Sequence, residues 1–428
     1  MFNDTFNHNS DRQSMTNHTA QTKQPVIMQV IPALGAGGAE QGCIDINNEL
    51  VRAGAKSIVV SNAGSRVHEI ARGGGLHIEL PVHSKNPITM MNNVGKLRDL
   101  IKEHNVDIVH ARSRAPAWSC YRACNAINKK TNQDAVKFMT TCHAPYNISG
   151  NAKRVYNSSI ARGQRVIAIS KFVQDYLTLN YKIDPRIIRV IHRGIALDKF
   201  HPNAVTAERM IKLSREWRLP DEANIIMLPG RLTRWKGHHV LIEAMAKLGR
   251  PDIFCVIIGA DQGRTGYRLE LEEMINEHGL GGQIRIIDHC NDMPAAYKLA
   301  NVVVSASTDP EGFGRVPVEA QAMGKPIIAT DHGGARETVR KRETGWLVTP
   351  HKTDELIAAL QEALSLTPAQ RSILATRAMA HIAANFTCEK MADDTLNVYA
   401  ELLEEKLSGQ SKLQPVAHDS PFSSGNMQ

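Results

Sequence analysis

The sequence predicts an α/β protein built from two doubly wound parallel sheets. Apolar runs of strand length alternate with segments of helical periodicity along almost the whole chain, which is typical of parallel sheets covered by helices. The alternation restarts after a polar stretch, 198–220. The chain has 428 residues, enough for two domains that each have a core. Ligands bind such sheets beyond the carboxyl ends of the strands, so two facing sheets would place a cleft between the domains.

The first half contains short apolar runs that predict strands, separated by segments that predict helices. The expected strands are Val26–Ile31, Ser57–Val60, Leu76–Leu80, Asp107–His110, Val136–Thr140, Arg165–Ile169 and Ile187–Ile191. Between them, apolar residues recur at helical spacing in Ala39–Arg52, Gly95–His104 and Lys171–Asn180.

The second half repeats this order with fewer strands. The expected strands are Asn224–Leu228, Ile253–Ile258, Ile284–Ile287, Val302–Val304 and Pro326–Ala329. The expected helices are Gly237–Lys247, Leu269–His278 and Asp354–Leu366, followed by Pro368–Asn385 and Glu389–Leu407.

These elements divide the chain into five parts. Residues 25–200 form the first doubly wound domain, residues 201–387 the second, and residues 388–407 a last helix. Residues 1–24 are rich in Asn, Thr, Gln and His without an apolar segment, so they predict a disordered tail rather than a secretory signal. Residues 408–428 predict a second disordered tail.

The composition is that of a globular protein with excess positive charge. Hydrophobic residues make up 42%, the net charge is +8 and the pI is about 9.1. This excess suits nucleotide diphosphates or an acidic membrane surface, although a merely basic surface is an equal alternative. Aromatic residues are only 5%, and no basic-aromatic module is visible, so nucleic acid is not an expected partner. No apolar run approaches the roughly 20 residues of a membrane span. Scattered cysteines favour a reducing compartment, so we expect a cytoplasmic protein.

The most informative segment reads DPEGFGRVPVE, residues 309–319. It follows an apolar strand and leads into a helix with proline in its first turn. Gly312 and Gly314 form the turn, so unpaired N–H groups at the helix start suit an anion. Glu311 and Glu319 lie on either side of that position. A carboxylate on each side suits a phosphate that carries polyols on both sides, which is a nucleotide-sugar.

A second glycine-rich turn, LGAGGAE at residues 34–40, directly follows the first strand. A dinucleotide fingerprint needs a glycine where Glu40 stands, so this motif does not predict NAD binding. No Gly-x-x-x-x-Gly-Lys-Ser/Thr run exists in the sequence, which excludes a nucleotide-kinase phosphate loop. Either Gly37 and Gly38 present their N–H groups to the cleft, or the turn is tight and binds nothing.

Arg231 and Lys236 lie in a loop, PGRLTRWKG, that follows the first strand of the second half. Both side chains can reach the expected cleft. A departing diphosphate accumulates negative charge, and a guanidinium and an ammonium stabilise such charge. Taken alone, this loop is better explained as a solvated basic loop. Together with Glu311 and Glu319 it favours binding of a diphosphate.

His143 is expected at the carboxyl end of a strand in the first domain, where side chains face a ligand. We interpret it as a hydrogen-bond partner of a sugar, against the alternative of a structural histidine; His110 is a weaker candidate of the same kind. The sequence has no Asp-x-Asp, no His/Cys cluster with zinc spacing and no Gly-x-Ser-x-Gly turn. No metal site is therefore predicted.

These motifs together resemble the retaining glycosyltransferases of family 4. The resemblance rests on Glu311…Glu319, Arg231…Lys236 and the first Gly-Gly turn, with DHGGARE at 331–337, ETGWLV at 343–348 and HRGIALDKFHP at 192–202. It spans about residues 25–405. It implies the GT-B fold, in which two Rossmann-like domains face each other across a cleft and a C-terminal helix crosses back to the first domain.

The resemblance also implies roles. Arg231 and Lys236 would bind the donor diphosphate, Glu319 the ribose and Glu311 the transferred sugar. In the same implied site, further donor contacts come from Gly312, Phe313, Gly314, Gly37 and Gly38, with His143 near the sugar. Arg315 stands where a small or apolar residue is commoner, and it would add a phosphate contact or change specificity. The donor would be a UDP- or GDP-linked sugar, with no other cofactor.

We therefore expect a retaining, metal-independent glycosyltransferase acting on a cell-envelope acceptor, either lipopolysaccharide or a lipid-linked saccharide. Basic residues of the first domain would let it contact anionic membrane at the cytoplasmic face of the inner membrane: Lys129, Lys130, Lys137, Lys153, Arg154, Arg162 and Arg165. The alternatives are a nucleotide-sugar epimerase of the same fold and a catalytically silent sugar-binding subunit.

Overall fold

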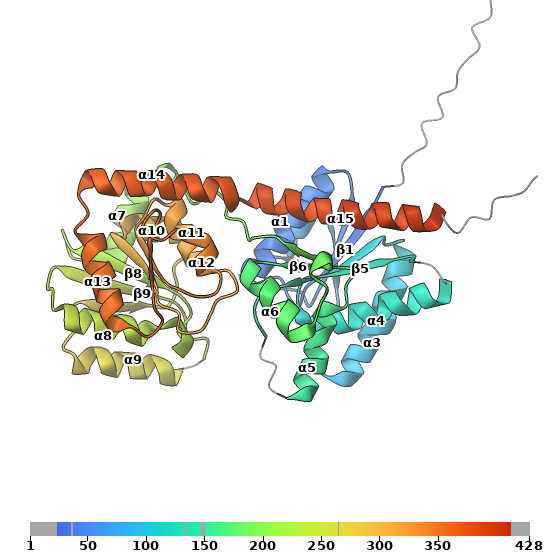
Figure 1. Ribbon diagram of the computed structural model, residues 1–428, viewed down its shortest axis with the longest axis horizontal. Coiled ribbons are helices and arrows are strands. Elements are labelled where there is room, and N and C mark those ends of the chain that lie inside the picture. Colours follow the sequence, from blue (N-terminus) through green and yellow to red (C-terminus); the bar gives the residue numbers. More distant parts are fainter. Residues whose placement is uncertain (1–23, 36, 132–133, 147–149, 264, 412–428) are drawn as a thin grey trace, which may run out of the picture.

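Two parallel sheets, one in each half of the chain, organise the protein (Figure 1). The computed structural model describes residues 24–35, 37–131, 134–146, 150–263 and 265–411. The predicted tails lie outside these residues except for Gln24 and residues 408–411, and the latter belong to the last helix. None of the described helices is both long and apolar enough to cross a membrane.

The N-terminal sheet has the strand order β3-β2-β1-β4-β5-β6-β7, and every neighbouring pair is parallel. Its direction of winding reverses between β1 and β4, which creates the crevice where such folds bind ligands. Its strands are β1 (Val26–Val30), β2 (Lys56–Ser61), β3 (Leu76–Glu79), β4 (Ile108–Ala111), β5 (Lys137–Cys142), β6 (Arg165–Ala168) and β7 (Ile188–Val190).

Helices cover both faces of this sheet. Residues of α1 and the last helix α15 share one apolar cluster with the sheet, and residues of α3 and α4 share another with its opposite face. The expected helix Gly95–His104 is only the second half of α3, and none of the expected helices corresponds to α2, α4 or α5. The helices are α1 (Gly38–Arg52), α2 (Val67–Arg72), α3 (Pro87–Glu103), α4 (Arg114–Thr131), α5 (Asn151–Asn157) and α6 (Lys171–Tyr181), with a 3₁₀ turn η1 (Ser158–Ala161).

The C-terminal sheet repeats the pattern in the order β10-β9-β8-β11-β12-β13, again entirely parallel. The short strand β13 was not predicted. Its strands are β8 (Asn224–Pro229), β9 (Ile253–Ile258), β10 (Ile284–Ile287), β11 (Val302–Ser305), β12 (Ile327–Thr330) and β13 (Trp346–Val348).

The helices α8, α9 and α13 cover one face of this sheet, and α7, α10, α11 and α12 cover the other. The polar stretch before β8 contains α7, whose Leu213 is buried in the core together with Trp217 just after it. The helices are α7 (Ala207–Glu216), α8 (His238–Leu248), α9 (Thr265–Glu277), α10 (Met293–Leu299), α11 (Arg315–Ala322), α12 (Ala335–Thr338) and α13 (Thr353–Leu364).

Two long helices at the end of the chain connect the domains. Figure 1 shows α14 (Pro368–Asn385) along the C-terminal domain and α15 (Cys388–Ser411) along the N-terminal domain, one after the other. Thr367 begins α14 with a capping box. The crossing helix α15 packs on α1 and β4 and continues past its expected end at residue 407.

The domains also meet through an apolar cluster. Phe313, from the C-terminal domain, is 3% exposed and shares this cluster with Ile160 and Val166 of the N-terminal domain. Its ring centroid lies 5.8 Å from that of Phe386, one of the two residues between α14 and α15. The apolar contact holds the two sheets close together, with their carboxyl ends toward a shared cavity.

Candidate active site

A cavity of about 1180 Å³ opens between the domains. Its wall is made of loops that leave the carboxyl ends of β1 and β5 in one domain and of β8 and β11 in the other. The wall includes all but one of the candidates that the sequence singled out, His110 being the exception: Gly37, Gly38, His143, Arg231, Lys236, Glu311, Gly312, Phe313, Gly314, Arg315 and Glu319. The structure thus brings these side chains to one place, while their roles stay predictions.

Lys236 and Glu311 form an ion pair inside this cavity. The Lys236 Nζ donates to Glu311 Oε1 at 2.7 Å, and the Ser307 hydroxyl donates to the same oxygen at 2.6 Å. Lys236 reaches this place through a tight turn at Gly237 (φ +73°), where a side chain would collide with the Ala306 carbonyl oxygen. A cation and a carboxylate therefore stand side by side at the carboxyl end of β8 and β11.

Arg231 lies in the same loop but is differently placed. It is exposed, and no carboxylate forms an ion pair with it within the described parts of the chain. Its side chain is thus available to an anion in the cavity. A guanidinium can make two parallel hydrogen bonds to a phosphate, which a lysine ammonium cannot.

Glu319 lies in α11, which begins directly after the turn at Gly314 (φ +82°). The carboxylate is 8% exposed and accepts a hydrogen bond from the Tyr297 hydroxyl at 2.7 Å. Arg315, one helical turn away, forms an ion pair with its other oxygen at 2.7 Å. The charge of Glu319 raises the pKa of Arg315, so the guanidinium stays protonated. A ligand hydroxyl that binds Glu319 would therefore meet Arg315 as well.

The loop that carries Glu311 touches the N-terminal domain through its backbone. The Ser170 hydroxyl donates to the Gly312 carbonyl oxygen at 2.5 Å. A Cβ atom at Gly312 would lie 2.5 Å from the His143 carbonyl oxygen, which is too close for a side chain. Glycine at this position therefore permits the close approach of the two domains next to the cavity.

His143 has both ring nitrogens engaged by the protein. Its Nε2 lies 2.6 Å from the Arg112 carbonyl oxygen, to which it donates, and its Nδ1 accepts from Arg193 Nη2 at 2.8 Å. Burial, together with the charges of Arg193 and Arg112, lowers the pKa of His143 well below its usual range. The imidazole is therefore neutral and oriented by its neighbours. Hydrogen bonding between its ring and a sugar would require one of these contacts to open.

Sequence reasoning did not single out Arg193, although the structure places it in the cavity wall. Burial, followed by the charges of Arg112 and Arg315, lowers its pKa to about 9. A Cβ atom at Gly38 would lie 3.1 Å from Arg193 Nη1 and 3.2 Å from Arg315 Cδ. Two guanidinium groups thus flank the first residue of α1, whose N-terminus has no side-chain cap. This wall of the cavity is strongly suited to anions.

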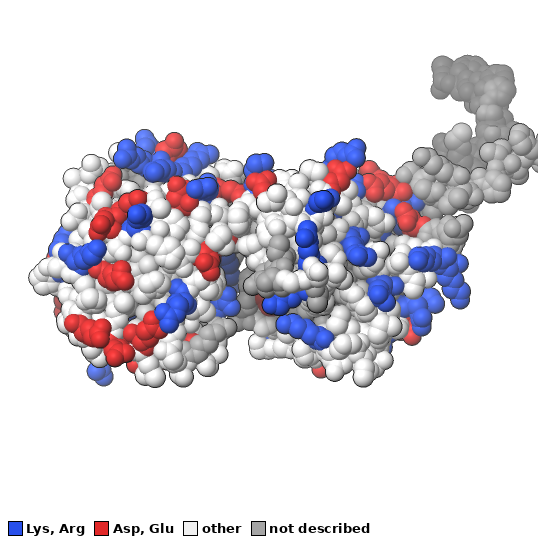
Figure 2. Space-filling view, turned by 60° about the horizontal axis from the view of Figure 1, so that its bottom comes forward, with Lys and Arg blue, Asp and Glu red and all other residues white. Residues whose placement is uncertain are grey.

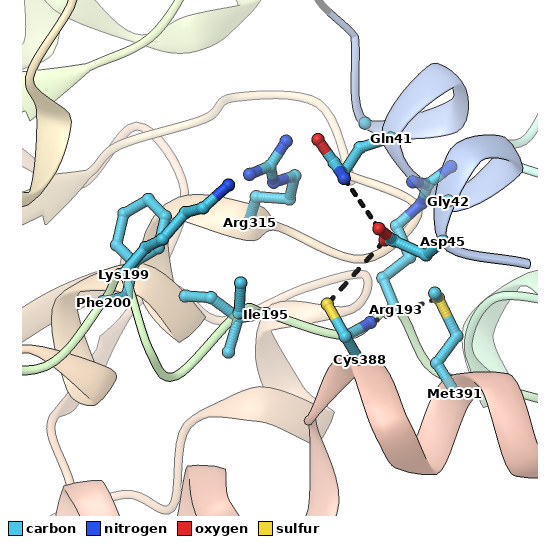
Figure 3. A pocket seen from close by; sticks show the side chains of 13 residues that line it. Gln41, Gly42, Asp45, Arg193, Ile195, Lys199, Phe200, Arg315, Cys388 and Met391 are labelled. Carbon is cyan, nitrogen blue, oxygen red and sulfur yellow. Dashed lines mark hydrogen bonds between the residues drawn. The ribbon is translucent and has the colours of Figure 1, made fainter. Parts of the chain in front are cut away.

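A smaller pocket of about 80 Å³ lies behind this wall, where α1, the 193–200 segment and α15 meet (Figure 3). Gln41 donates to Asp45 Oδ1 at 2.7 Å, and the Cys388 thiol donates to Asp45 Oδ2 at 3.8 Å. Burial raises the pKa of Asp45. The pocket shares Arg193 and Arg315 with the main cavity and lies at the junction between the domains.

The weaker candidate His110 lies outside the cavity wall. His110 is fully buried, and its ring nitrogens lie 2.7 Å from the hydroxyls of Tyr399 and Thr141. Among the residues that the structure describes, no three or more His, Cys, Asp or Glu side chains are arranged to hold a metal ion.

Comparison with known protein families identifies both halves of the chain. The model described as "Glycosyltransferase Family 4" matches residues 36–199, and the model described as "Glycosyl transferases group 1" matches residues 210–379. A D-inositol 3-phosphate glycosyltransferase of Streptomyces bingchenggensis is 32% identical over 253 residues, which are 57% of this chain and 54% of that protein. The match thus spans about half the length of this curated relative.

Solved structures resemble the chain over most of its length. A glycosyltransferase from Rickettsia africae is 38% identical, with a TM-score of 0.81 over 89% of this chain and 99% of that chain. The HepE protein of Anabaena, solved in complex with UDP-glucose, is 22% identical, with a TM-score of 0.75 over 88% of this chain and 99% of that chain. The two facing sheets and the crossing helix define a protein of the GT-B class. This chain belongs to the family 4 glycosyltransferases.

Proposed function

We propose that the protein transfers a sugar from a nucleotide-diphosphate sugar to an acceptor of the cell envelope, with retention of anomeric configuration and without a metal ion. One observation carries this proposal: Arg231 and Lys236 line the same cavity as the carboxylates Glu311 and Glu319. Such a donor requires cations that bind its diphosphate and carboxylates that bind the hydroxyls on both sides of the diphosphate.

The donor would lie across the C-terminal side of the cavity. Arg231 and Lys236 would bind the diphosphate, Glu319 the ribose and Glu311 the sugar. The base would be uracil or guanine; the UDP-glucose complex of HepE favours UDP as the first donor to test. The Lys236–Glu311 ion pair would then share its charges with the phosphate and a sugar hydroxyl.

The transfer itself needs charge stabilisation more than a nucleophilic side chain. The bond between the anomeric carbon and the diphosphate oxygen breaks, the bond to the acceptor oxygen forms on the same face, and the acceptor proton passes to the leaving diphosphate. Arg231 and Lys236 would stabilise the charge that develops on that leaving group. Their presence is our reason for proposing metal independence, and unchanged activity in excess EDTA is the expected result.

The acceptor would enter along the N-terminal domain, as lipopolysaccharide or a lipid-linked saccharide, at the cytoplasmic face of the inner membrane. Two of the basic residues expected to contact an anionic membrane are not free to do so. Lys137 is 4% exposed and pairs with Asp134 at 3.0 Å, and Arg165 pairs with Glu401 and Glu405 on α15. Lys129, Lys130 and Arg162 remain exposed.

Incubation with labelled UDP- and GDP-sugars, with and without membrane extract, tests the proposal. A transferase gives a labelled glycolipid only when the extract is present, and NMR of that product reports an anomeric configuration equal to that of the donor. An epimerase would change the donor without extract, and a silent subunit would do neither. Inversion of configuration would contradict the retaining mechanism.

A further inference from the structure

A groove on the N-terminal domain, away from the Arg231–Lys236 wall, has a mixed apolar and basic lining. It consists of two adjoining hollows of about 620 and 540 Å³ between α3, α4, α5 and η1. Both hollows share Met91, Trp118 and Arg122. Figure 2 shows that Lys and Arg predominate on the visible face of the N-terminal domain, whereas that of the C-terminal domain carries both signs of charge.

The apolar residues around the groove are unusually exposed. Met91, in both hollows, is 52% exposed, and Val155, in the second, is 67% exposed. Single exposed apolar residues are common on proteins, but several beside one hollow indicate a binding surface. The hydroxyl of Tyr156, which lines the first hollow, is buried without a hydrogen-bond partner among the described residues. A buried hydroxyl without a partner costs free energy, so this position suits a ligand with an acceptor oxygen.

The charges of the groove are all positive. Lys85, Arg122 and Lys153 line the first hollow, and no acidic side chain lines either hollow within the described chain. The Arg122 guanidinium lies 4.2 Å from the centroid of Trp118, and the Arg162 guanidinium lies 5.3 Å from that of Tyr121. A guanidinium that stacks on a ring keeps its N–H groups free at its edge for an anion.

Arg114 connects the lining of the groove with a residue next to the active-site cavity. Arg114 stacks on both Tyr156 of the first hollow and Tyr146, and its guanidinium carbon lies 5.6 Å and 4.7 Å from the two ring centroids. Tyr146 directly follows the cavity-wall segment that contains His143. The groove and the cavity therefore lie on the same side chain network of the N-terminal domain.

We infer that this groove binds the lipid phosphate portion of a lipid-linked acceptor, with the apolar chain against Met91 and Trp118 and the phosphate among Lys85, Arg122 and Tyr156. The inference rests on the proposed function, because it names the class of acceptor for the same cavity. Free lipopolysaccharide core sugars without a lipid phosphate would lack both parts of this recognition.

The test uses the full chain and dodecyl phosphate below its critical micelle concentration, followed by calorimetric titration. Dodecyl phosphate should bind saturably. Inorganic phosphate lacks the alkyl chain and a neutral dodecyl glycoside lacks the phosphate, so each should bind at least about tenfold more weakly. Equal binding of the neutral glycoside would overturn the role of the basic residues.

Variants locate the binding. Met91→Gln and Arg122→Gln, both at exposed positions, should each weaken dodecyl phosphate binding at least about fivefold. The matched controls on the C-terminal domain, Leu269→Gln and Lys247→Gln, should leave it unchanged; Leu269 is 62% exposed. Similar losses in both pairs would contradict the inference. Loss of binding to anionic vesicles with unchanged binding of monomeric dodecyl phosphate would make this face a membrane contact instead and would also overturn it.

The outcome can be separated from that of the proposed function. The groove variants should bind UDP as the wild-type protein does, because they lie outside the donor cavity. Failure of the wild-type protein to bind UDP would contradict the proposed function, whatever the groove binds. Normal UDP binding combined with no binding of dodecyl phosphate would contradict only the inference about the groove.

Discussion

Glu337 of the C-terminal domain accepts a hydrogen bond from the His192 ring of the N-terminal domain at 2.8 Å. The same carboxylate accepts from the backbone N–H groups of Lys171 and Phe172, at 2.8 and 2.9 Å. It therefore caps the N-terminus of α6 across the domain boundary. The backbone of its own segment contacts the donor loop, because Gly334 N donates to the Glu311 carbonyl oxygen at 2.9 Å. The segment that contains Gly334 and Glu337 therefore contacts both the N-terminal domain and the backbone of Glu311.

Replacement of this carboxylate should open the cleft. Glu337→Gln removes a charge-assisted cap worth about 1 kcal/mol, so the ratio of closed to open molecules should fall roughly fivefold. Small-angle scattering should report a larger radius of gyration, with UDP affinity retained and kcat reduced. An unchanged radius and an unchanged kcat would show that Glu337 has no part in closure.

The pH dependence of this contact has a definite sign. Burial alone would raise the pKa of Glu337, but the hydrogen bonds from His192 and from the α6 backbone outweigh burial and lower it below 4.5. The contact is therefore complete above 4.5 and is lost as the pH falls through the lowered value. Wild type should open on acidification in that range, and Glu337→Gln should not show this transition.

Gly312 should be intolerant of even one methyl group. In Gly312→Ala the new Cβ would lie 2.5 Å from the His143 carbonyl oxygen, so the domains must separate locally. We expect transfer to fall at least about tenfold while each domain stays folded by circular dichroism. Gly266→Ala is the control, because nothing lies within 4 Å of its Cβ position. Equal activity of both variants would contradict the close approach.

Arg315 should act on the ribose site through Glu319. Arg315→Ala removes the ion pair at 2.7 Å and leaves Glu319 bonded to the Tyr297 hydroxyl. Glu319 then no longer pairs with a cation that competes with ribose hydroxyls, so uridine should bind slightly better. UDP should bind more weakly, because a cation near its phosphates is lost. Calorimetric titration of both ligands separates the two effects. A parallel loss for uridine and UDP would argue against a phosphate contact of Arg315.

The charge of Arg193 should be lost in a measurable range of pH. Its pKa is lowered to about 9 by burial and by the neighbouring charges of Arg112 and Arg315, so the positive charge disappears as the pH rises through that value. Affinity for UDP should fall between pH 8 and 10 more steeply in wild type than in Arg193→Gln. Titration of UDP itself affects both proteins equally, so the difference between the two curves reports Arg193 alone. Parallel curves would show that Arg193 does not contribute charge to the site.

The fold could be predicted because buried parallel strands are short apolar runs. The predicted bounds of the strands Ile253–Ile258 and Ile284–Ile287 agree with the observed ones at both ends. Strand β13 was missed because only three residues form it, within a turn-rich segment. Helix α4 was missed because its buried face consists largely of small residues such as Ala117, Ser119 and Ala123, which give a weak hydrophobic pattern.

The candidate site was predictable where one loop carried both the turn and the charged residue, as in 229–237 and 309–319. Arg193 lies in the 192–202 motif but was not singled out, because its importance arises from neighbours on other elements, Gly38 and His143. The two ring contacts that occupy His143 depend on tertiary structure for the same reason. Its position at a strand end was nevertheless correctly anticipated, directly after β5.

The most direct test of the account is the transfer rate of the Lys236→Ala variant with a UDP- or GDP-sugar and membrane extract. Lys236 pairs with Glu311 at 2.7 Å and would stabilise the departing diphosphate, so its loss should raise the barrier by about 3–4 kcal/mol and slow transfer roughly 10²- to 10³-fold, with the fold intact. Lys247→Ala, on the exposed surface of the same domain, is the control. A Lys236→Ala protein that kept most of its transfer activity would contradict the central claim.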